Sequence, residues 1–295
     1  MPKILVTGSE GQVGTEIKKL AVQKQINIIA TTKKELDITK LNNIEDVIIK
    51  SRPAIIINAA AYTAVDKAEE EIDKTFLINS DGTANLAQVC RNAGIPLLHI
   101  STDYVFDGTK KESYKETDTP SPESIYGKSK LYGEEAIRST LDKHIILRTS
   151  WVFSSRGQNF PKTMLRLANE RNILNIVDDQ FGAPTWAGDI ANVMLDIANN
   201  HIKKQKTNWG VYHYTGMPNT NWFEFANKII EQAIKTGIQK KAPNINAISS
   251  KEYPTAAKRP MNSVMDCKKI QEEFGIAQAD WNIGLNRVLN DWKIL

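Results

Sequence analysis

Tyr126 and Lys130 are two residues whose types and spacing suit proton transfer. They lie four positions apart, so on a helix they would share one face, and a helical pattern continues over 131–141. An ammonium beside a phenol favours the phenolate and lowers the pKa of the phenol. A tyrosine four positions before a lysine is also common on the surface of helices, so the spacing alone leaves both interpretations open.

Thr102 is a third residue that could act with this pair, because it follows an apolar run at 95–100. That run predicts a buried strand, whose carboxyl end would present Thr102 and Asp103 to a site. A threonine hydroxyl there could hydrogen-bond the same oxygen as the tyrosine. The strand-end residues and the tyrosine–lysine pair together favour a catalytic site over an ordinary surface helix.

A glycine-rich turn opens the chain at Gly8, Gly11 and Gly14, between a strand-like run at 3–7 and an amphipathic stretch at 15–25. Strand, glycine turn and helix are the context that a dinucleotide-binding loop requires. Glycines allow a tight turn and the close approach of a pyrophosphate, which sits on the helix amino terminus. The spacing is G-x-x-G-x-x-G rather than G-x-G-x-x-G, but its place directly after a strand favours cofactor binding over a purely structural turn.

The second strand-like run, at 27–30, ends in Thr31-Thr32-Lys33-Lys34. Dinucleotide-binding units often carry an acid here that holds the adenosine ribose, and this chain has none before Glu35. Hydroxyls and ammoniums suit a 2′-phosphate, so the segment leans towards NADPH or towards use of both NADPH and NADH. A solvated turn is the alternative. Asp37 is expected either to reach the adenine side of the cofactor or to cap a helix.

Strand-like runs alternate with helical patterns through the first half of the chain, at 3–7, 27–30, 54–57, 95–100 and 143–147. Regular alternation of this kind predicts a parallel, doubly wound sheet of the Rossmann type. The alternation weakens beyond Trp151. We therefore predict an α/β protein with a dinucleotide-binding domain at 1–150, to which some later segments return, and a smaller mixed lobe at 151–295 that mainly binds substrate.

The composition is that of a globular protein, with 295 residues, 41% hydrophobic and 24% charged, and a net charge of +4. This charge is too small to argue for nucleic acid, and no apolar run approaches the ~20 residues that span a membrane. Cys90 and Cys267 define no disulfide framework, and the four histidines lack the spacing of zinc ligands. We expect a soluble cytoplasmic protein with no nucleic-acid partner, no membrane partner and no zinc site.

Longer runs of residues carry a resemblance that covers nearly the whole chain. They are 8–14, 58–69, 101–106, 126–130, 148–152, 159–160, 179–185 and 259–260. On these runs the sequence resembles the dTDP-4-dehydrorhamnose reductases, which are extended short-chain dehydrogenases/reductases. The tyrosine–lysine pair marks only the superfamily, whereas Thr-Ala-Val-Asp-Lys-Ala-Glu at 63–69 and Asp-Gln-Phe-Gly-Ala-Pro-Thr at 179–185 are more specific to this family.

The resemblance implies NAD(P)H-dependent reduction of the 4-keto group of dTDP-4-dehydro-6-deoxy-L-mannose to dTDP-L-rhamnose. It makes Tyr126 the proton donor and places Lys130 on the nicotinamide ribose. Contacts with the sugar-nucleotide substrate are then expected from Thr102, Asp103, Trp151, Gln180 and Arg259. The resemblance also implies contacts with the cofactor. Together with the residues of the glycine turn and of the end of the second strand, the expected cofactor contacts are Gly8, Gly11, Gln12, Val13, Gly14, Thr32, Lys33, Asp37, Ile38, Ala61, Tyr62, Thr63, Tyr126 and Lys130.

The chain departs from the family in two places. Some members carry an acid where Thr32 stands, which leaves the choice between NADPH and NADH open. Some members also use an acidic pair to hold a magnesium-linked dimer. Glu16 matches one partner of that pair but Gly188 stands at the other, which puts the magnesium in doubt and leaves monomer or homodimer open.

Two other functions are alternatives to the reductase. One is a sugar-nucleotide epimerase on the same scaffold, which keeps its NAD bound. The other is a non-catalytic NADP-binding regulatory subunit of another enzyme. Such subunits can lose the tyrosine–lysine pair, which is intact in this chain.

Overall fold

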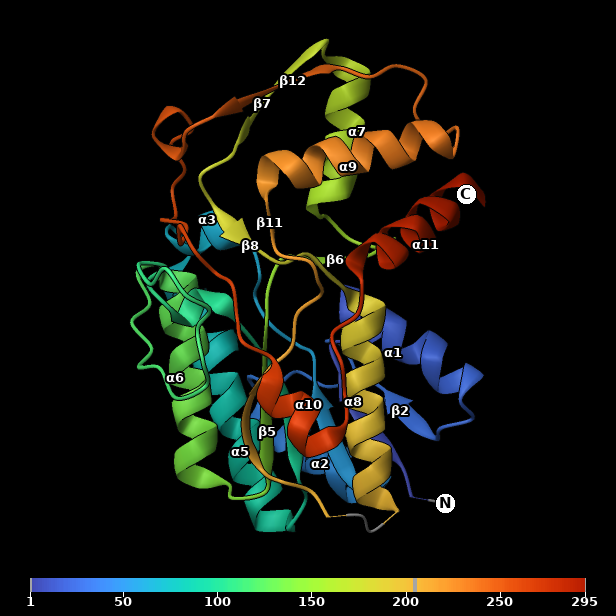
Figure 1. The fold of residues 1–295 in the computed structure, drawn as a ribbon. Helices are drawn as coiled ribbons and strands as arrows, with labels where there is room; N and C mark the ends of the chain where they lie inside the picture. The colour runs from blue at the N-terminus through green and yellow to red at the C-terminus, as the bar shows by residue number, and fades with distance from the viewer. Residues whose placement is uncertain (1, 204–205, 295) are drawn as a thin grey trace.

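A parallel sheet forms the centre of the larger lobe in the computed structural model, which describes residues 2–203 and 206–294 (Figure 1). Its six strands lie in the order β10-β5-β4-β3-β1-β2, and each neighbouring pair is parallel. The strands are β1 (Ile4–Thr7), β2 (Ile28–Ala30), β3 (Ile55–Asn58), β4 (Leu97–Thr102), β5 (His144–Thr149) and β10 (Gly210–His213). The predicted Rossmann-type doubly wound sheet is confirmed.

Both faces of this sheet are covered by helices, which explains why its strands read as continuous apolar runs. Ile4 and Val6 face one helical layer, and Leu5 between them faces the other. The first layer contains α1 (Gln12–Gln23) and α8 (Ala187–Ile202). The second contains α2 (Leu41–Ser51), α5 (Gly82–Ala93) and α6 (Ile125–Thr140). The sheet is thus held rigidly enough to fix the positions of residues at its carboxyl edge.

The helical stretch between β3 and β4 is broken into segments. They are α4 (Ile72–Phe76), a π-helical turn (Leu77–Asp81) and α5, with the short α3 (Val65–Ala68) before them. Asn79 lies on the π-helical turn, a feature that often occurs at functional sites. Its amide accepts from the backbone N–H of Tyr62 at 2.8 Å and donates to the Tyr62 carbonyl at 3.0 Å. The turn therefore fixes the loop that follows β3.

A second lobe lies beyond the carboxyl edge of the sheet, at the top of Figure 1. Its own apolar core is built mainly from three helices and the strand β7. Its elements are β6 (Val152–Phe153), α7 (Phe160–Glu170), β7 (Ile173–Val177), β8 (Phe181–Gly182), β9 (Thr185–Trp186), β11 (Thr220–Asn221), α9 (Trp222–Lys235), β12 (Asn244–Ile248) and α11 (Trp281–Ile294). Asn221 caps α9, because its side chain accepts from the Glu224 N–H at 2.7 Å.

Segments from the second half of the chain also return to the sheet. β10 pairs with β5 along its whole length, and α8 packs on α1. α10 (Lys268–Phe274) joins the same layer through Ile270. The segment at 178–186 contains the two short strands β8 and β9. Across the described ranges, the helices are too short or too polar for any of them to cross a membrane.

Candidate active site

A cavity of ≈ 580 Å³ lies at the carboxyl ends of β4 and β5, beside the start of α6. This is the edge at which open α/β sheets place their ligands. The residues predicted from the sequence that line it are Gly11, Gln12, Val13, Ala61, Thr63, Thr102, Asp103, Tyr126, Lys130 and Trp151. One cavity therefore brings together the glycine turn, the strand-end residues and the tyrosine–lysine pair.

Tyr126 and Lys130 project from the first turns of α6. The helix begins after Ser124, whose hydroxyl accepts from the Gly127 N–H at 3.1 Å, and this cap fixes the helical register. Both side chains are buried and line the cavity, whereas Lys128 between them is exposed. The shared face predicted from their spacing is confirmed.

Burial controls the acidity of Tyr126. It raises the pKa of the phenol to about 12, and the nearby Asp103 carboxylate acts in the same direction. A hydrogen bond with the Thr102 hydroxyl lowers that pKa by less than burial raises it. The lowered phenol pKa expected from the neighbouring lysine is therefore wrong for the protein without cofactor. The phenol keeps its proton near neutral pH, which is the form that a proton donor requires.

Thr102 and Asp103 form a small polar cluster at the end of β4. The Thr102 hydroxyl donates to Asp103 Oδ1 at 2.9 Å and accepts from the Tyr104 N–H at 3.2 Å. Asp103 is 3% exposed, and burial raises its pKa to about 6. Its Oδ2 atom is buried without a hydrogen-bond partner among the described residues, because the nearby Ser263 hydroxyl, which lowers the Asp103 pKa, donates instead to the Phe181 carbonyl at 3.2 Å. A buried, unpartnered carboxylate oxygen at the cavity wall is suited to accept from a ligand hydroxyl.

Lys130 is held by β4, the strand that carries Thr102. Its Nζ donates to the Ile100 carbonyl at 2.7 Å and lies 3.1 Å from His99 Nε2. Burial lowers the pKa of Lys130 to about 8, against the opposing charge of Glu134 one turn further along α6. Glu134 forms a buried ion pair with Arg148 of β5 at 2.6 Å. The pKa of Lys130 therefore lies close to neutral pH, so a small change in its surroundings can change its charge.

The glycine turn brings backbone close to backbone where a dinucleotide would approach. Gly8 has φ +65°, and a Cβ there would lie 2.6 Å from the Ala60 nitrogen. A Cβ on Gly14 would lie 2.3 Å from the Gly8 carbonyl oxygen. Gly11 caps α1 without a side chain, which leaves the amino terminus of the helix open to an anion. This cradle fits a pyrophosphate, although Gly14 serves the packing of the turn rather than the cavity wall.

A smaller groove of ≈ 210 Å³ continues from the main cavity, with which it shares Gly11 and Ala61. Gly8, Lys33, Asp37 and Ile38 also line it, as expected for the adenosine end of a dinucleotide. Asp37 does not cap α2. Its carboxylate instead accepts from the N–H and hydroxyl of Thr39, at 3.1 and 2.8 Å, and hydrogen bonding to Thr39 holds the Asp37 pKa below its usual value.

Thr32 does not line this groove, but its backbone N–H donates to the Glu35 carboxylate at 2.8 Å. The sequence places Glu35 beyond the end of the strand, yet the fold turns its carboxylate back to the strand end. A negative charge therefore lies nearer to the ribose end of the groove than the order of residues suggests.

Trp151 has a strained backbone, with φ +46°, an uncommon value for a residue with a large side chain. Its ring stacks on Trp222, with 3.5 Å between centroids and 9° between planes. Gly182 allows the contact, because a Cβ there would lie 2.6 Å from the Trp151 ring. The Trp151 ring therefore forms part of the cavity wall and also packs on Trp222 of the second lobe.

Three other predicted residues lie outside both cavities. Gln180 is buried, and Tyr62 donates from its hydroxyl to Glu71 at 3.0 Å. Arg259 forms an ion pair with Asp66, at 2.8 and 3.1 Å. Since Asp66 belongs to the family-specific run at 63–69, that run and the loop at 259–260 hold each other in place.

Two buried residues behind the cavity, Asn58 and His99, were not predicted from the sequence as part of the site. Asn58 ends β3 and His99 lies within β4, both fully buried and hydrogen-bonded to each other at 2.9 Å. A histidine in a buried parallel strand is a signal that could have been noticed, because polar residues there need partners. Its partner could be found only from strand register, which pairs Asn58 with His99.

A possible metal site was left open by the sequence. Within 2–203 and 206–294, no group of three or more histidine, cysteine or acidic residues is arranged to hold a metal ion. Glu16 is buried and pairs with Lys19 at 3.0 Å. A Cβ on Gly188 would lie 2.4 Å from the Trp186 ring, so this ring fills the space that a side chain at position 188 would need.

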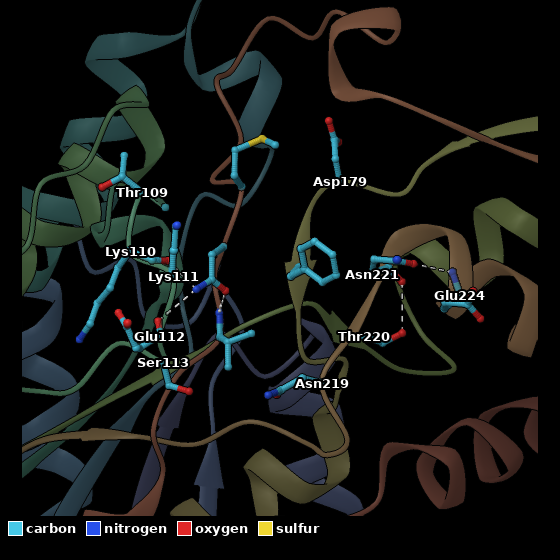
Figure 2. A pocket seen from close by; sticks show the side chains of 15 residues that line it. Thr109, Lys110, Lys111, Glu112, Ser113, Asp179, Asn219, Thr220, Asn221 and Glu224 are labelled. Carbon is cyan, nitrogen blue, oxygen red and sulfur yellow. Dashed lines mark hydrogen bonds between the residues drawn. The ribbon is translucent and has the colours of Figure 1, made fainter.

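A separate cavity of ≈ 770 Å³ lies beside β8 (Figure 2). Residues of the 109–113 loop face Asn219, Asn221 and Glu224 across it. Alternate residues of a strand point to opposite faces, so Phe181 lines this cavity while Gly182 faces Trp151. None of the predicted site residues lines it.

A Rossmann-type parallel sheet, a glycine turn at the first strand and a buried tyrosine–lysine pair on one helix define an oxidoreductase of the short-chain dehydrogenase/reductase class. The family model for the RmlD substrate binding domain matches residues 2–294. The chain therefore belongs to this family.

Relatives of known name agree with this assignment. The dTDP-4-dehydrorhamnose reductase of Aggregatibacter actinomycetemcomitans is 45% identical over 289 residues, which cover 98% of each protein. That of Escherichia coli K12 is 39% identical over 292 residues, 98% of this chain and 97% of the relative. The family and the enzyme class predicted from the sequence are confirmed.

A solved structure of dTDP-4-dehydrorhamnose reductase from Bacillus anthracis in complex with NADP superposes with a TM-score of 0.89. It is 35% identical, and the match covers 99% of this chain and 100% of that one. A UDP-glucose 4-epimerase from Thermus thermophilus, in complex with NAD, reaches a TM-score of 0.79 at 20% identity. The likeness to the epimerase shows a common fold alone.

Proposed function

We propose that the protein reduces the 4-keto group of dTDP-4-dehydro-6-deoxy-L-mannose to dTDP-L-rhamnose with NADPH or NADH. The observation that carries this proposal is the cavity in which Thr102, Tyr126 and Lys130 meet beside the glycine turn. Family membership supplies the substrate class, since relatives at 39–45% identity are dTDP-4-dehydrorhamnose reductases. The Bacillus anthracis complex with NADP supports the cofactor.

The residues present fit a dinucleotide. The cradle formed by Gly8, Gly11 and the open start of α1 would hold its pyrophosphate, and the groove beside Asp37 and Lys33 would take the adenosine end. When bound, the nicotinamide supplies the hydride that a carbonyl carbon needs. The protein then has to orient the ketone and provide a proton.

Tyr126 is the proton donor in this proposal. Burial keeps its phenol protonated until negative charge develops on the carbonyl oxygen, which then takes the proton. The Thr102 hydroxyl holds the phenol at the end of β4. Lys130, released from the Ile100 carbonyl, would hold the nicotinamide ribose and stabilise the tyrosinate left behind.

Asp103 and Trp151 orient the sugar in this proposal. The unpartnered Oδ2 of Asp103 would accept from a sugar hydroxyl, and the Trp151 ring would pack on the sugar. Arg259, which pairs with Asp66 outside the cavity, would contact a substrate that extends beyond the cavity. We also propose a cytoplasmic location, where the pyridine nucleotide that the enzyme oxidises is reduced again.

The test is oxidation of NADPH by the purified protein against a panel of dTDP- and UDP-4-keto sugars. We expect one mole of NADPH consumed per mole of the dTDP-4-keto-6-deoxy sugar. Conversion of a sugar nucleotide without net consumption of NADPH would instead identify an epimerase. Tight NADP binding without turnover of any panel member would identify a binding subunit.

A further inference from the structure

Four buried side chains form a chain of hydrogen bonds that crosses the sheet to Lys130. Thr7, Asn58 and His99 are fully buried, and Lys130 is 2% exposed. Thr7 pairs with Asn58 in the register of β1 and β3, and Asn58 pairs with His99 in that of β3 and β4. The register of the parallel strands therefore places Thr7, Asn58 and His99 side by side, and no loop residue is needed to position them.

The direction of the chain is set at Asn58. Its Oδ1 receives the Thr7 hydroxyl at 2.6 Å and the backbone N–H of Ala60 at 3.1 Å. A backbone N–H can only donate, so the atom that it contacts is the amide oxygen and not the nitrogen. The Asn58 Nδ2 therefore points to His99 Nδ1, 2.9 Å away, and donates to it.

This donation selects one form of the imidazole. Because Nδ1 of His99 accepts, the neutral ring carries its proton on Nε2. That Nε2 lies 3.1 Å from Lys130 Nζ, which also donates to the Ile100 carbonyl at 2.7 Å. An ammonium has three donors and no acceptor, whereas a neutral amine has a lone pair that can accept from Nε2–H.

We propose that His99 is a positioning residue that, oriented by Asn58, donates to the neutral amine of Lys130 and stabilises that form relative to the ammonium in the resting enzyme. The consequence for catalysis rests on the proposed function, in which Lys130 serves Tyr126. After Tyr126 has given up its proton, Lys130 takes one from water, and the resulting ammonium, which gives up its proton easily, is a better acid for returning that proton to the Tyr126 oxygen.

The charges around Lys130 are consistent with this role. On its own helix it faces Glu134 and Tyr126, on β4 it faces His99 with Asp103 beyond, and Arg148 of β5 lies behind Glu134. The charge of Glu134 favours the ammonium, but this carboxylate already accepts from the Arg148 guanidinium and the Ser101 hydroxyl. Burial lowers the pKa of Lys130 to about 8 and that of His99 well below its ordinary value.

The first measurement is the protonation of His99 in the wild-type protein, by nitrogen NMR with isotope-labelled histidine. We expect a neutral ring with the proton on Nε2 across the neutral pH range. A proton on Nδ1 would overturn the proposal whatever the variants show. The resting protein is used, so the result does not depend on turnover.

The second measurement is the titration of Lys130 by NMR with labelled lysine, in wild type and in Asn58→Asp. A carboxylate at position 58 would accept from Nδ1–H, move the histidine proton away from Nε2 and let Nε2 accept from an ammonium. We expect the pKa of Lys130 to rise by at least about one unit, a tenfold change in proton affinity. His99→Gln offers an amide oxygen to the ammonium and should act in the same direction.

The matched control is His144→Gln, because His144 is also buried in the sheet but bonds to the Leu141 carbonyl. It should leave the titration of Lys130 unchanged. An unchanged titration in both Asn58→Asp and His99→Gln would overturn the proposal. The proposed function fails separately, if Lys130→Ala turns over normally while the His99 proton is found on Nε2.

Discussion

The two ends of the proposed active site differ in the groups that form them. The cofactor end is backbone: a glycine turn, an open helix start and small residues after β3. The catalytic end is side chain: a phenol, an amine, a carboxylate and an imidazole, each buried and each with a pKa moved by burial. The cofactor end should therefore tolerate changes that keep the backbone close, whereas the catalytic end should respond to the loss of single atoms.

The change expected to separate the two ends most is Tyr126→Phe, which removes one oxygen and keeps the ring. We expect kcat to fall at least about a hundredfold, because general acid catalysis contributes about 10²–10⁴. Cofactor affinity, measured by fluorescence titration, should change little. Turnover at the wild-type level would exclude Tyr126 as the donor.

Lys130→Ala should harm both ends at once, since the amine is proposed to serve ribose and phenol. We expect a large fall in kcat together with weaker cofactor binding, measured by steady-state kinetics and titration. Lys128→Ala is the matched control, because this lysine is exposed on another face of α6 and should be near neutral. Equal damage from both changes would contradict the assigned roles.

Gly14→Ala tests whether the cofactor end depends on backbone contact. The added methyl would lie 2.3 Å from the Gly8 carbonyl oxygen, so the turn must move. We expect a loss of stability of about 1–3 kcal/mol by denaturant unfolding, together with weaker cofactor binding. Gly94→Ala, at a helix end with open space around it, should leave cofactor affinity unchanged. Wild-type cofactor binding in Gly14→Ala would contradict a backbone cradle.

Trp151→Ala should raise the KM for the sugar nucleotide by roughly tenfold, because an aromatic wall is lost from the cavity. The Tm should fall only slightly, since Trp151 is only partly buried and the stacking contributes about 0.5–1.5 kcal/mol beyond the buried area. Trp222→Ala removes the ring on which Trp151 stacks and should raise the KM less. A large loss of stability with a normal KM would assign Trp151 to packing alone.

The smallest effect is expected at the ribose end of the groove. We expect kcat/KM for NADPH to exceed that for NADH by up to roughly tenfold, about 1.4 kcal/mol, because exposed cation–phosphate contacts are screened. Lys33→Ala/Lys34→Ala should lower this ratio and Glu35→Ala should raise it, measured at low salt. Preference for NADH in wild type would show that the Glu35 carboxylate outweighs the lysines.

The contrast between the ends also explains what the sequence could predict. Backbone features depend on glycines and strand order, so the Rossmann-type sheet and the turn at 8–14 were predicted correctly. The spacing of Tyr126 and Lys130 was sufficient to place them on one face. The raised pKa of Tyr126 and the contact between Asn58 and His99 depend on burial and on strand register, neither of which local patterns contain.

The return of β10 to the sheet has a consequence for synthesis of the chain. Until β10 arrives, β5 is an edge strand with a row of unpaired N–H and C=O groups. The apolar face that α8 covers is open during the same interval. A nascent chain that ends near position 150 therefore exposes both an unpaired edge strand and an apolar face of the sheet. The sheet of the first half is completed only after α8 and β10, the second of which ends at position 213, have been synthesised.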